Sequence, residues 1–199
     1  MSYLRFDKTL MTNLEESLPK EILRSNRSGA YSCSTIVDCN TRKYHGLLVV
    51  PVPELDDENH VLLSSLDATV IQHGAEFNLG LHKYNGGNFS PRGHKYIREF
   101  DSLQVPTTTY RVGDVVLRRE MMFQHFENRI IIRYTLLDAH CPTTMRLQPF
   151  LAFRSVREYT YENSKASREF HEVQNGIKTC MYPGYPELFM QLNKENEFV

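Results

Sequence analysis

The densest group of polar side chains is the run 40–46, Asn-Thr-Arg-Lys-Tyr-His-Gly, which stands directly before the apolar run 47–50. If this run enters a β-strand, alternation places Arg42 and Tyr44 on one face and His45 on the other. A guanidinium fork, a phenol and an imidazole suit the hydroxyl groups and the apolar ring face of a sugar. The alternative, weighted equally, is structural: Arg42 pairs with a carboxylate and Tyr44 packs at a sheet edge.

Other chemical motifs are missing from the sequence. Its 8 histidines show no HxxxH spacing, so a zinc site is not expected. Neither a phosphate-binding GxxxxGK[ST] loop nor a GxSxG nucleophile motif occurs. We therefore expect no metal and no cofactor.

The elements that would position the polar run are strands. Residues 115–120 alternate with period two, and residues 130–137 are rich in branched and aromatic side chains. Gly113-Asp114 and Asn175-Gly176 predict tight hairpin turns. Strands are expected at 30–37, 46–52, 61–66 and 68–72, in a meander over 107–154, and again at 186–193. The one helix predicted is short, beginning near 12–16 with Thr12 or Asn13 as its cap.

About a dozen strands without intervening helices predict an all-β fold, a large antiparallel β-sandwich with at most one or two short helices. A chain of 199 residues fits a single such domain over 1–199. The stretches 51–59 and 82–93 are expected to be surface loops. The second loop holds aromatic residues between glycines, which suits either a binding loop or a plain connection.

Composition narrows the possible partners. The 23 basic and 24 acidic residues nearly balance, so nothing attracts nucleic acid or an anionic membrane. The start of the chain carries charges where a signal peptide needs an apolar core, and no stretch is long and apolar enough to span a membrane. The 4 cysteines form no CxxC pair and are too sparse for a disulfide framework, so a cytoplasmic location is expected.

Four ordered blocks within about 20–165 resemble one known family. The runs 26–32 (Asn-Arg-Ser-Gly-Ala-Tyr-Ser) and 41–48 (Thr-Arg-Lys-Tyr-His-Gly-Leu-Leu) are similar to Asn-Gly-x-Gly-Gly-Tyr and Thr-Arg-x-Tyr-His-Gly-Leu-Leu. These motifs open the bacterial and archaeal glycogen-debranching (amylo-α-1,6-glucosidase) family. The likeness continues at 106–113 (Pro-Thr-Thr-Thr-Tyr-Arg-Val-Gly) and at 147–154 (Leu-Gln-Pro-Phe-Leu-Ala-Phe-Arg).

The resemblance implies an amino-terminal β-supersandwich, of the kind found in galactose mutarotase and in the amino-terminal domain of glucoamylase. It also implies a catalytic (α/α)6 barrel after residue 199 in the same polypeptide. The parent enzyme would hydrolyse α-1,6-glucosidic branch points of glycogen or a related α-glucan without a cofactor. The present chain would pack on the barrel and shape the glucan cleft, with Arg42, Tyr44, His45 and Arg154 as substrate-binding residues.

Glycoside hydrolysis needs two positioned carboxyl groups, and the sequence offers no convincing pair. Glu99 and Asp101, beside Arg98, are expected to form cross-strand ion pairs, and the run 56–58 (Asp-Asp-Glu) is expected to be solvated loop charge. No catalytic residue is therefore predicted within the chain.

Two other functions stay open. The chain could be a stand-alone carbohydrate-binding or structural sandwich, which predicts maltooligosaccharide binding that depends on aromatic side chains such as Tyr44, Tyr84 or Phe89. It could also be a mutarotase-like sugar epimerase, which needs a histidine and a carboxylate facing one cleft.

Overall fold

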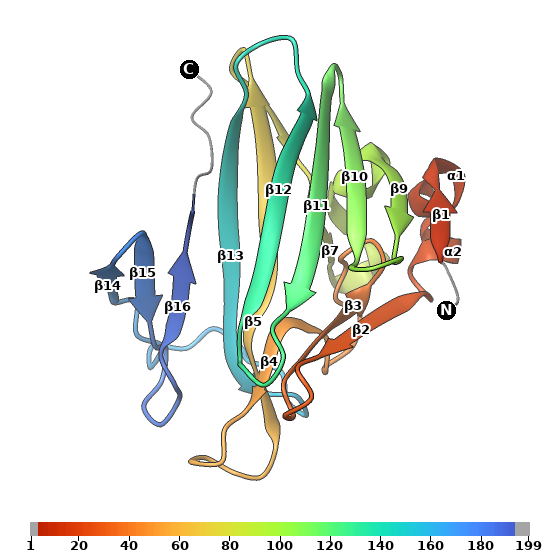
Figure 1. The fold of residues 1–199 in the computed structure, drawn as a ribbon. Helices are drawn as coiled ribbons and strands as arrows, with labels where there is room; N and C mark the ends of the chain where they lie inside the picture. The colour runs from red at the N-terminus through yellow and green to blue at the C-terminus, as the bar shows by residue number, and fades with distance from the viewer. Residues whose placement is uncertain (1–3, 194–199) are drawn as a thin grey trace.

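Two antiparallel sheets stacked face to face make up the body of the computed structural model, which describes residues 4–193 (Figure 1). Sheet A has the order β1-β9-β10-β11-β12, with bounds Arg5–Asp7, Ile97–Asp101, Thr107–Val112, Val115–Phe123 and Ile130–Asp138. Sheet B has the order β13-β5-β4-β3-β2, with bounds Thr144–Ser155, Asn59–Gln72, Gly46–Pro51, Tyr31–Thr35 and Glu21–Ser25; β6 (Ala75–Asn78) also pairs with β5. The predicted all-β sandwich is confirmed.

Two smaller sheets accompany the sandwich. One contains β14 (Phe170–Val173), β15 (Gly176–Thr179) and β16 (Leu188–Gln191), and the other is the hairpin of β7 (Leu81–Lys83) and β8 (Phe89–Arg92). The helices are short: α1 (Lys8–Thr12), α2 (Leu14–Ser17), η1 (Asn85–Gly87) and η2 (Gly93–Tyr96). No helix in the described range 4–193 is long and apolar enough to cross a membrane.

The turn chemistry predicted the β10–β11 and β14–β15 hairpins. Gly113 has φ 60° in the turn from β10 to β11, and Asn175 has φ 58° in the turn from β14 to β15, both in the left-handed region that such turns require. The predicted helix is present as α2, and the Asn13 side chain caps it by accepting from the Glu15 amide at 3.1 Å.

Three expectations about the elements were wrong. The strands expected at 61–66 and 68–72 form the single 14-residue strand β5, because β13 pairs along its length. Residues 82–93 hold most of the β7–β8 hairpin rather than an irregular loop. The strand β2 and the helix α1 were not predicted, since each is too short to carry a clear hydrophobic period.

Apolar side chains between the two sheets form two clusters. The first is centred on residues such as Val70, Phe100 and Val115, and the second on residues such as Leu62, Phe123 and Phe153. Burial of these side chains is the main favourable contribution to folding.

Asn26 fastens the β2–β3 connection to the far sheet. Its fully buried side chain accepts from the amides of Ser28 and Ala30 at 2.8 and 3.0 Å. Its amide nitrogen donates to the carbonyl of Glu127 at 3.0 Å and to the Asn128 side chain at 3.2 Å, in the turn between β11 and β12. All of its polar atoms are therefore satisfied inside the protein.

We predict that Asn26→Ala lowers the free energy of unfolding by roughly 2–4 kcal/mol, because it leaves buried backbone groups unpaired. Urea denaturation measures the change, with Asn88→Ala at the exposed tip of the β7–β8 hairpin as the control. Equal effects of the two substitutions would contradict the prediction.

Candidate functional site

The polar run lies in the connection between β3 and β4, which folds back against sheet B. The Thr35 hydroxyl donates to the Cys39 carbonyl at 3.1 Å and accepts from the Cys39 amide at 3.0 Å. The Asn40 side chain accepts from the Ser34 hydroxyl at 2.8 Å and donates to the Ser64 carbonyl on β5 at 2.8 Å. These bonds fix the path of the chain into residues 41–45.

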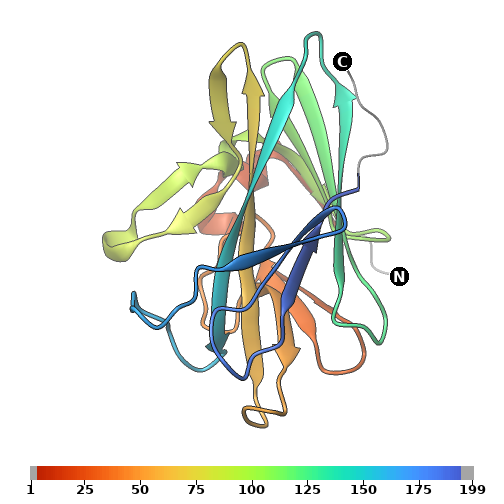
Figure 2. The same ribbon diagram turned by 90° about the vertical axis from the view of Figure 1, so that its left-hand side faces the viewer.

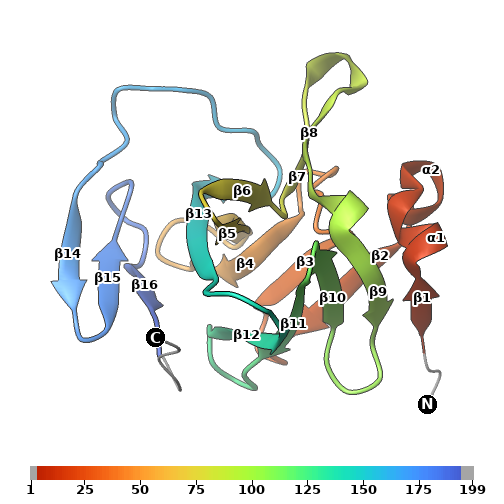
Figure 3. The ribbon, with the colours of Figure 1, turned by 90° about the horizontal axis from the view of Figure 1, so that it is seen from above.

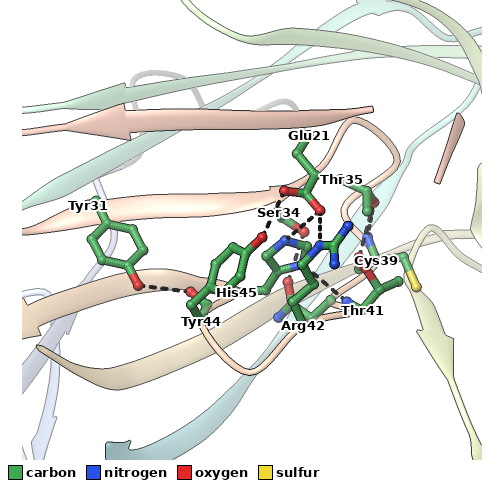
Figure 4. Close-up of polar contacts among 10 residues, drawn as sticks. Glu21, Tyr31, Ser34, Thr35, Cys39, Thr41, Arg42, Tyr44 and His45 are labelled. Carbon is green, nitrogen blue, oxygen red and sulfur yellow. Dashed lines mark hydrogen bonds and ion pairs between the residues drawn. The ribbon is translucent and has the colours of Figure 1, made fainter. Parts of the chain in front are cut away.

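The expectation that residues 42–45 alternate along a strand was wrong, because they form a turn before β4 begins at Gly46. The turn brings Arg42, Tyr44 and His45 together around the Glu21 carboxylate of β2 (Figure 4). Arg42 Nε donates to Glu21 Oε1 at 2.5 Å, and the Tyr44 hydroxyl donates to Oε2 at 3.2 Å. His45 Nε2 lies 3.4 Å from Oε1. We call Glu21, Arg42, Tyr44 and His45 the Glu21 cluster.

His45 is fully buried beneath this cluster. The Thr41 amide donates to His45 Nδ1 at 3.1 Å, so Nδ1 carries no proton and the neutral ring holds its proton on Nε2, facing Glu21. Burial lowers the pKa of His45, and the Glu21 carboxylate opposes this shift without cancelling it. The imidazole is therefore neutral at pH 7.

Glu21 is ionised under the same conditions. Burial raises its pKa, but the hydrogen bond from Arg42 and the electrostatic effects of His45 and Arg42 outweigh burial, so the net pKa is lowered. The hydrogen bond to Glu21 raises the pKa of Arg42 in turn. The Glu21 cluster is thus an ion pair with a phenol as a further donor and with a neutral imidazole whose Nε2 lies beside the carboxylate without a hydrogen bond of good geometry.

The side chains of Glu21, Cys33 and His45 place one potential metal ligand each within 4.8 Å of the others. A histidine that binds metal through Nε2 normally donates its Nδ1 proton to an acceptor. Here Nδ1 faces the Thr41 amide, which is itself a donor, and Arg42 already occupies the Glu21 carboxylate. This donor set does not fit a resident metal ion.

Gly46 allows the turn to lie close to the sheet. A Cβ atom at this position would come 2.7 Å from Val61 Cγ1 and 2.8 Å from Val49 Cγ2. Both valines are fully buried, so neither can move aside without strain. The small residue therefore sets the depth at which His45 is buried.

Arg154, the fourth predicted residue, lies on β13 rather than in the Glu21 cluster. The register across sheet B aligns Tyr31, Val49, Val61 and Arg154 in one row on neighbouring strands. The Tyr31 hydroxyl donates to the Tyr44 carbonyl at 3.0 Å, which joins this row to the turn (Figure 4).

This row is on the outer face of sheet B. The neighbouring residues Ser32 and Phe153 point inward: the Ser32 hydroxyl contacts Met121 of sheet A, and Phe153 belongs to the second core cluster. Because strand side chains alternate, Tyr31 and Arg154 point outward.

The Arg154 guanidinium is held in place by its own loop. Its Nη1 donates to the carbonyls of Ser155 and Glu158 at 3.0 and 2.9 Å, and its Cζ lies 5.8 Å from the centre of the Tyr159 ring. Burial lowers the pKa of Arg154, while the phenols of Tyr159 and Tyr31 oppose the shift.

Sequence reasoning missed Glu21, Tyr31 and Tyr159. Glu21 stands 21 positions before Arg42 in a segment without a motif, and only the pairing of β2 with β3 brings the two together. The other carboxylates are explained by simpler contacts. Glu99 forms the expected cross-strand ion pair, with Arg5 at 2.5 Å, and Asp56 lies 2.9 Å from His60 Nε2.

Fold and site together define a β-sandwich domain with a polar cluster on the outer face of one sheet. The family model described as "Glycogen debranching enzyme N terminal" matches residues 20–199. The chain therefore belongs to the family of amino-terminal domains of glycogen debranching enzymes. No curated protein and no solved structure matches the chain significantly.

We predict that Glu21→Gln lowers the free energy of unfolding by about 1–2 kcal/mol, because it weakens the hydrogen bonds from Arg42 and Tyr44 and removes the charge that faces the buried His45. The control is Glu76→Gln, which removes a carboxylate paired with Arg146 alone at an exposed site. Thermal denaturation should show a lower midpoint for Glu21→Gln than for Glu76→Gln, and the reverse order would contradict the prediction.

We also predict a pH dependence from His45. Its pKa in the folded state lies below the ordinary 6.5, so in acid the unfolded chain binds a proton that the folded chain does not. Stability falls as the pH is lowered from about 6.5 toward the folded pKa, by at most about 1.4 kcal/mol per pH unit. The test is the free energy of unfolding at pH 7.5 and 5.5, which should differ less in His45→Gln than in the unchanged protein. An NMR titration showing protonation of His45 at or above 6.5 would refute it.

Proposed function

We propose that this chain, over 1–199, is the non-catalytic accessory domain of a glycogen-debranching glycoside hydrolase, whose catalytic (α/α)6 barrel lies further along the same polypeptide. The parent enzyme hydrolyses α-1,6-glucosidic branch points of an α-glucan. In this proposal the sandwich packs on the barrel and forms part of the rim of the glucan cleft. The family match and the outward-facing Glu21 cluster support it.

The observation that carries the binding proposal is the convergence of Arg42 and Tyr44 on Glu21. Glu21 holds both side chains, while 41% of Tyr44 and 56% of the Arg42 side chain remain exposed. A fixed guanidinium and a fixed aromatic ring give hydrogen bonds to hydroxyl groups and a stacking surface at little entropic cost. Arg42, Tyr44 and Arg154 are the proposed glucan contacts.

His45 has a different role in this proposal. Its side chain is sealed from solvent, so it acts on the substrate through Glu21 and through its edge-on contact with the Tyr44 ring, with centroids 5.1 Å apart. The same burial argues against His45 as the histidine of a mutarotase-like epimerase. His45 and the Glu21 carboxylate do meet here, but the imidazole cannot reach a sugar.

A cytoplasmic location belongs to the same proposal. All four cysteines are free thiols, and Cys33 and Cys39 are buried. Unpaired buried thiols suit a reducing compartment such as the cytoplasm.

The test uses the complete polypeptide that contains this chain, assayed for glucose released from a branched α-glucan carrying single α-1,6-linked glucosyl stubs. We predict that Arg42→Ala and Tyr44→Ala each raise KM roughly tenfold with little change in kcat. The reason is that each substitution removes binding energy that the bound substrate and the transition state share equally. Arg146→Ala, an exposed arginine on β13, is the matched control.

Absence of glucose release by the complete polypeptide would overturn the debranching proposal. Release with unchanged KM in both variants would leave debranching standing and overturn the placement of the glucan on the Glu21 cluster.

A further inference from the structure

The loop that follows β13 projects from the same side of sheet B as the β7–β8 hairpin, and both stand clear of the sandwich in two perpendicular views (Figures 2 and 3). This loop spans 156–169 and carries Tyr159, which is 55% exposed. The outer face of sheet B thus presents exposed aromatic side chains besides Tyr44.

Tyr159 joins the two halves of the proposed site. The Lys43 ammonium lies 5.1 Å from the centre of its ring, and the Arg154 guanidinium lies 5.8 Å from it. Lys43 belongs to the turn that holds Arg42 and Tyr44, whereas Arg154 lies on β13. One ring therefore links the Glu21 cluster to the arginine that stands apart from it.

From this arrangement we infer that Tyr159, with Lys43 and Arg154 at its ring, is a second aromatic contact for a linear α-glucan, next to the contact at Tyr44. The inference rests on the proposed function and extends it, because it names the part of the glucan that this domain holds. The ring offers a stacking surface to a pyranose face, and the two cations donate hydrogen bonds to sugar hydroxyls.

Charge on this face is paired only in part. Arg42 is neutralised by Glu21, and Arg157, in the same projecting loop, by Glu58, each with atoms 2.5 Å apart. The Arg154 guanidinium at the Tyr159 ring donates to the backbone carbonyls of Ser155 and Glu158 instead. The choice of an uncharged glucan as the ligand therefore rests on the family match.

The spacing favours an oligosaccharide. Tyr31, which bonds the backbone of Tyr44, and Arg154 are three strand spacings apart along the row, or about 14 Å. These are backbone positions, and the Lys43 and Arg154 side chains close part of this distance at the Tyr159 ring. A linear segment of a few glucose units can contact both Tyr44 and Tyr159.

The experiment is an NMR titration of the complete polypeptide that contains this chain, with residues 1–199 alone labelled with ¹⁵N, using maltoheptaose as the probe and glucose for comparison. We expect saturable shifts both at 41–45 and at 154–161, and an affinity for maltoheptaose at least tenfold higher than for glucose. Tyr159→Ala should weaken maltoheptaose binding about five- to tenfold, as expected for the loss of one stacking contact. Tyr159→Phe should retain it, because the ring remains.

Tyr161→Ala is the matched control, since Tyr161 lies in the same loop and is 80% exposed. We expect this change to leave binding as it is. Tyr159 is 55% exposed, so its substitution leaves the core packing unchanged, and the spectrum of free Tyr159→Ala checks the fold.

Three outcomes would overturn the inference: no shifts with millimolar maltoheptaose, equal affinity for glucose and maltoheptaose, or equal effects of Tyr159→Ala and Tyr161→Ala. None of these bears on glucose release by the complete polypeptide, so failure of the inference is distinguishable from failure of the proposed function.

Discussion

The Glu21 carboxylate is the interaction on which the outer face of sheet B depends. It accepts from Arg42 and Tyr44 and faces the buried Nε2 proton of His45. Without a fixed acceptor, a guanidinium and a phenol on a turn would sample many rotamers, and the buried imidazole would have no carboxylate beside its Nε2. One carboxylate thus orders three side chains contributed by a single turn.

The interior behind the turn is also polar. Asp38, in the same β3–β4 connection, pairs with Arg119 of sheet A at 2.6 Å, and Asp67 in the middle of β5 pairs with His82 of the β7–β8 hairpin at 2.9 Å. A cavity of about 40 Å³ lies between these pairs, and Arg119 Nε has no protein partner in it. Paired charges and small hydroxyl residues therefore hold the β3–β4 connection and the β7–β8 hairpin onto a β-sandwich whose interior is otherwise apolar.

Much of the fold could be predicted because it follows from local patterns. The alternation in 115–120 and the turns at Gly113-Asp114 and Asn175-Gly176 predicted β10–β11 and β14–β15 correctly. Prediction failed where the structure depends on a distant partner. β5 stays continuous through Asp67 because β13 pairs along its length. The Asp67 carboxylate is held by His82, with Gly80 packed against it, and no local pattern around Asp67 signals such a partner.

The sequence by itself determined the all-β class, the polar turn chemistry of 41–46 and the membership of the glycogen-debranching family, because each depends on residue types at short spacing. Only the tertiary structure decided that Arg42, Tyr44 and His45 meet at Glu21 and that His45 is buried. It also decided that Arg154 lies beside Tyr159, on a strand three positions from β3 in sheet B. The physical reason is strand pairing: β2 on β3, and β13 on β5, bring together side chains that are far apart along the chain.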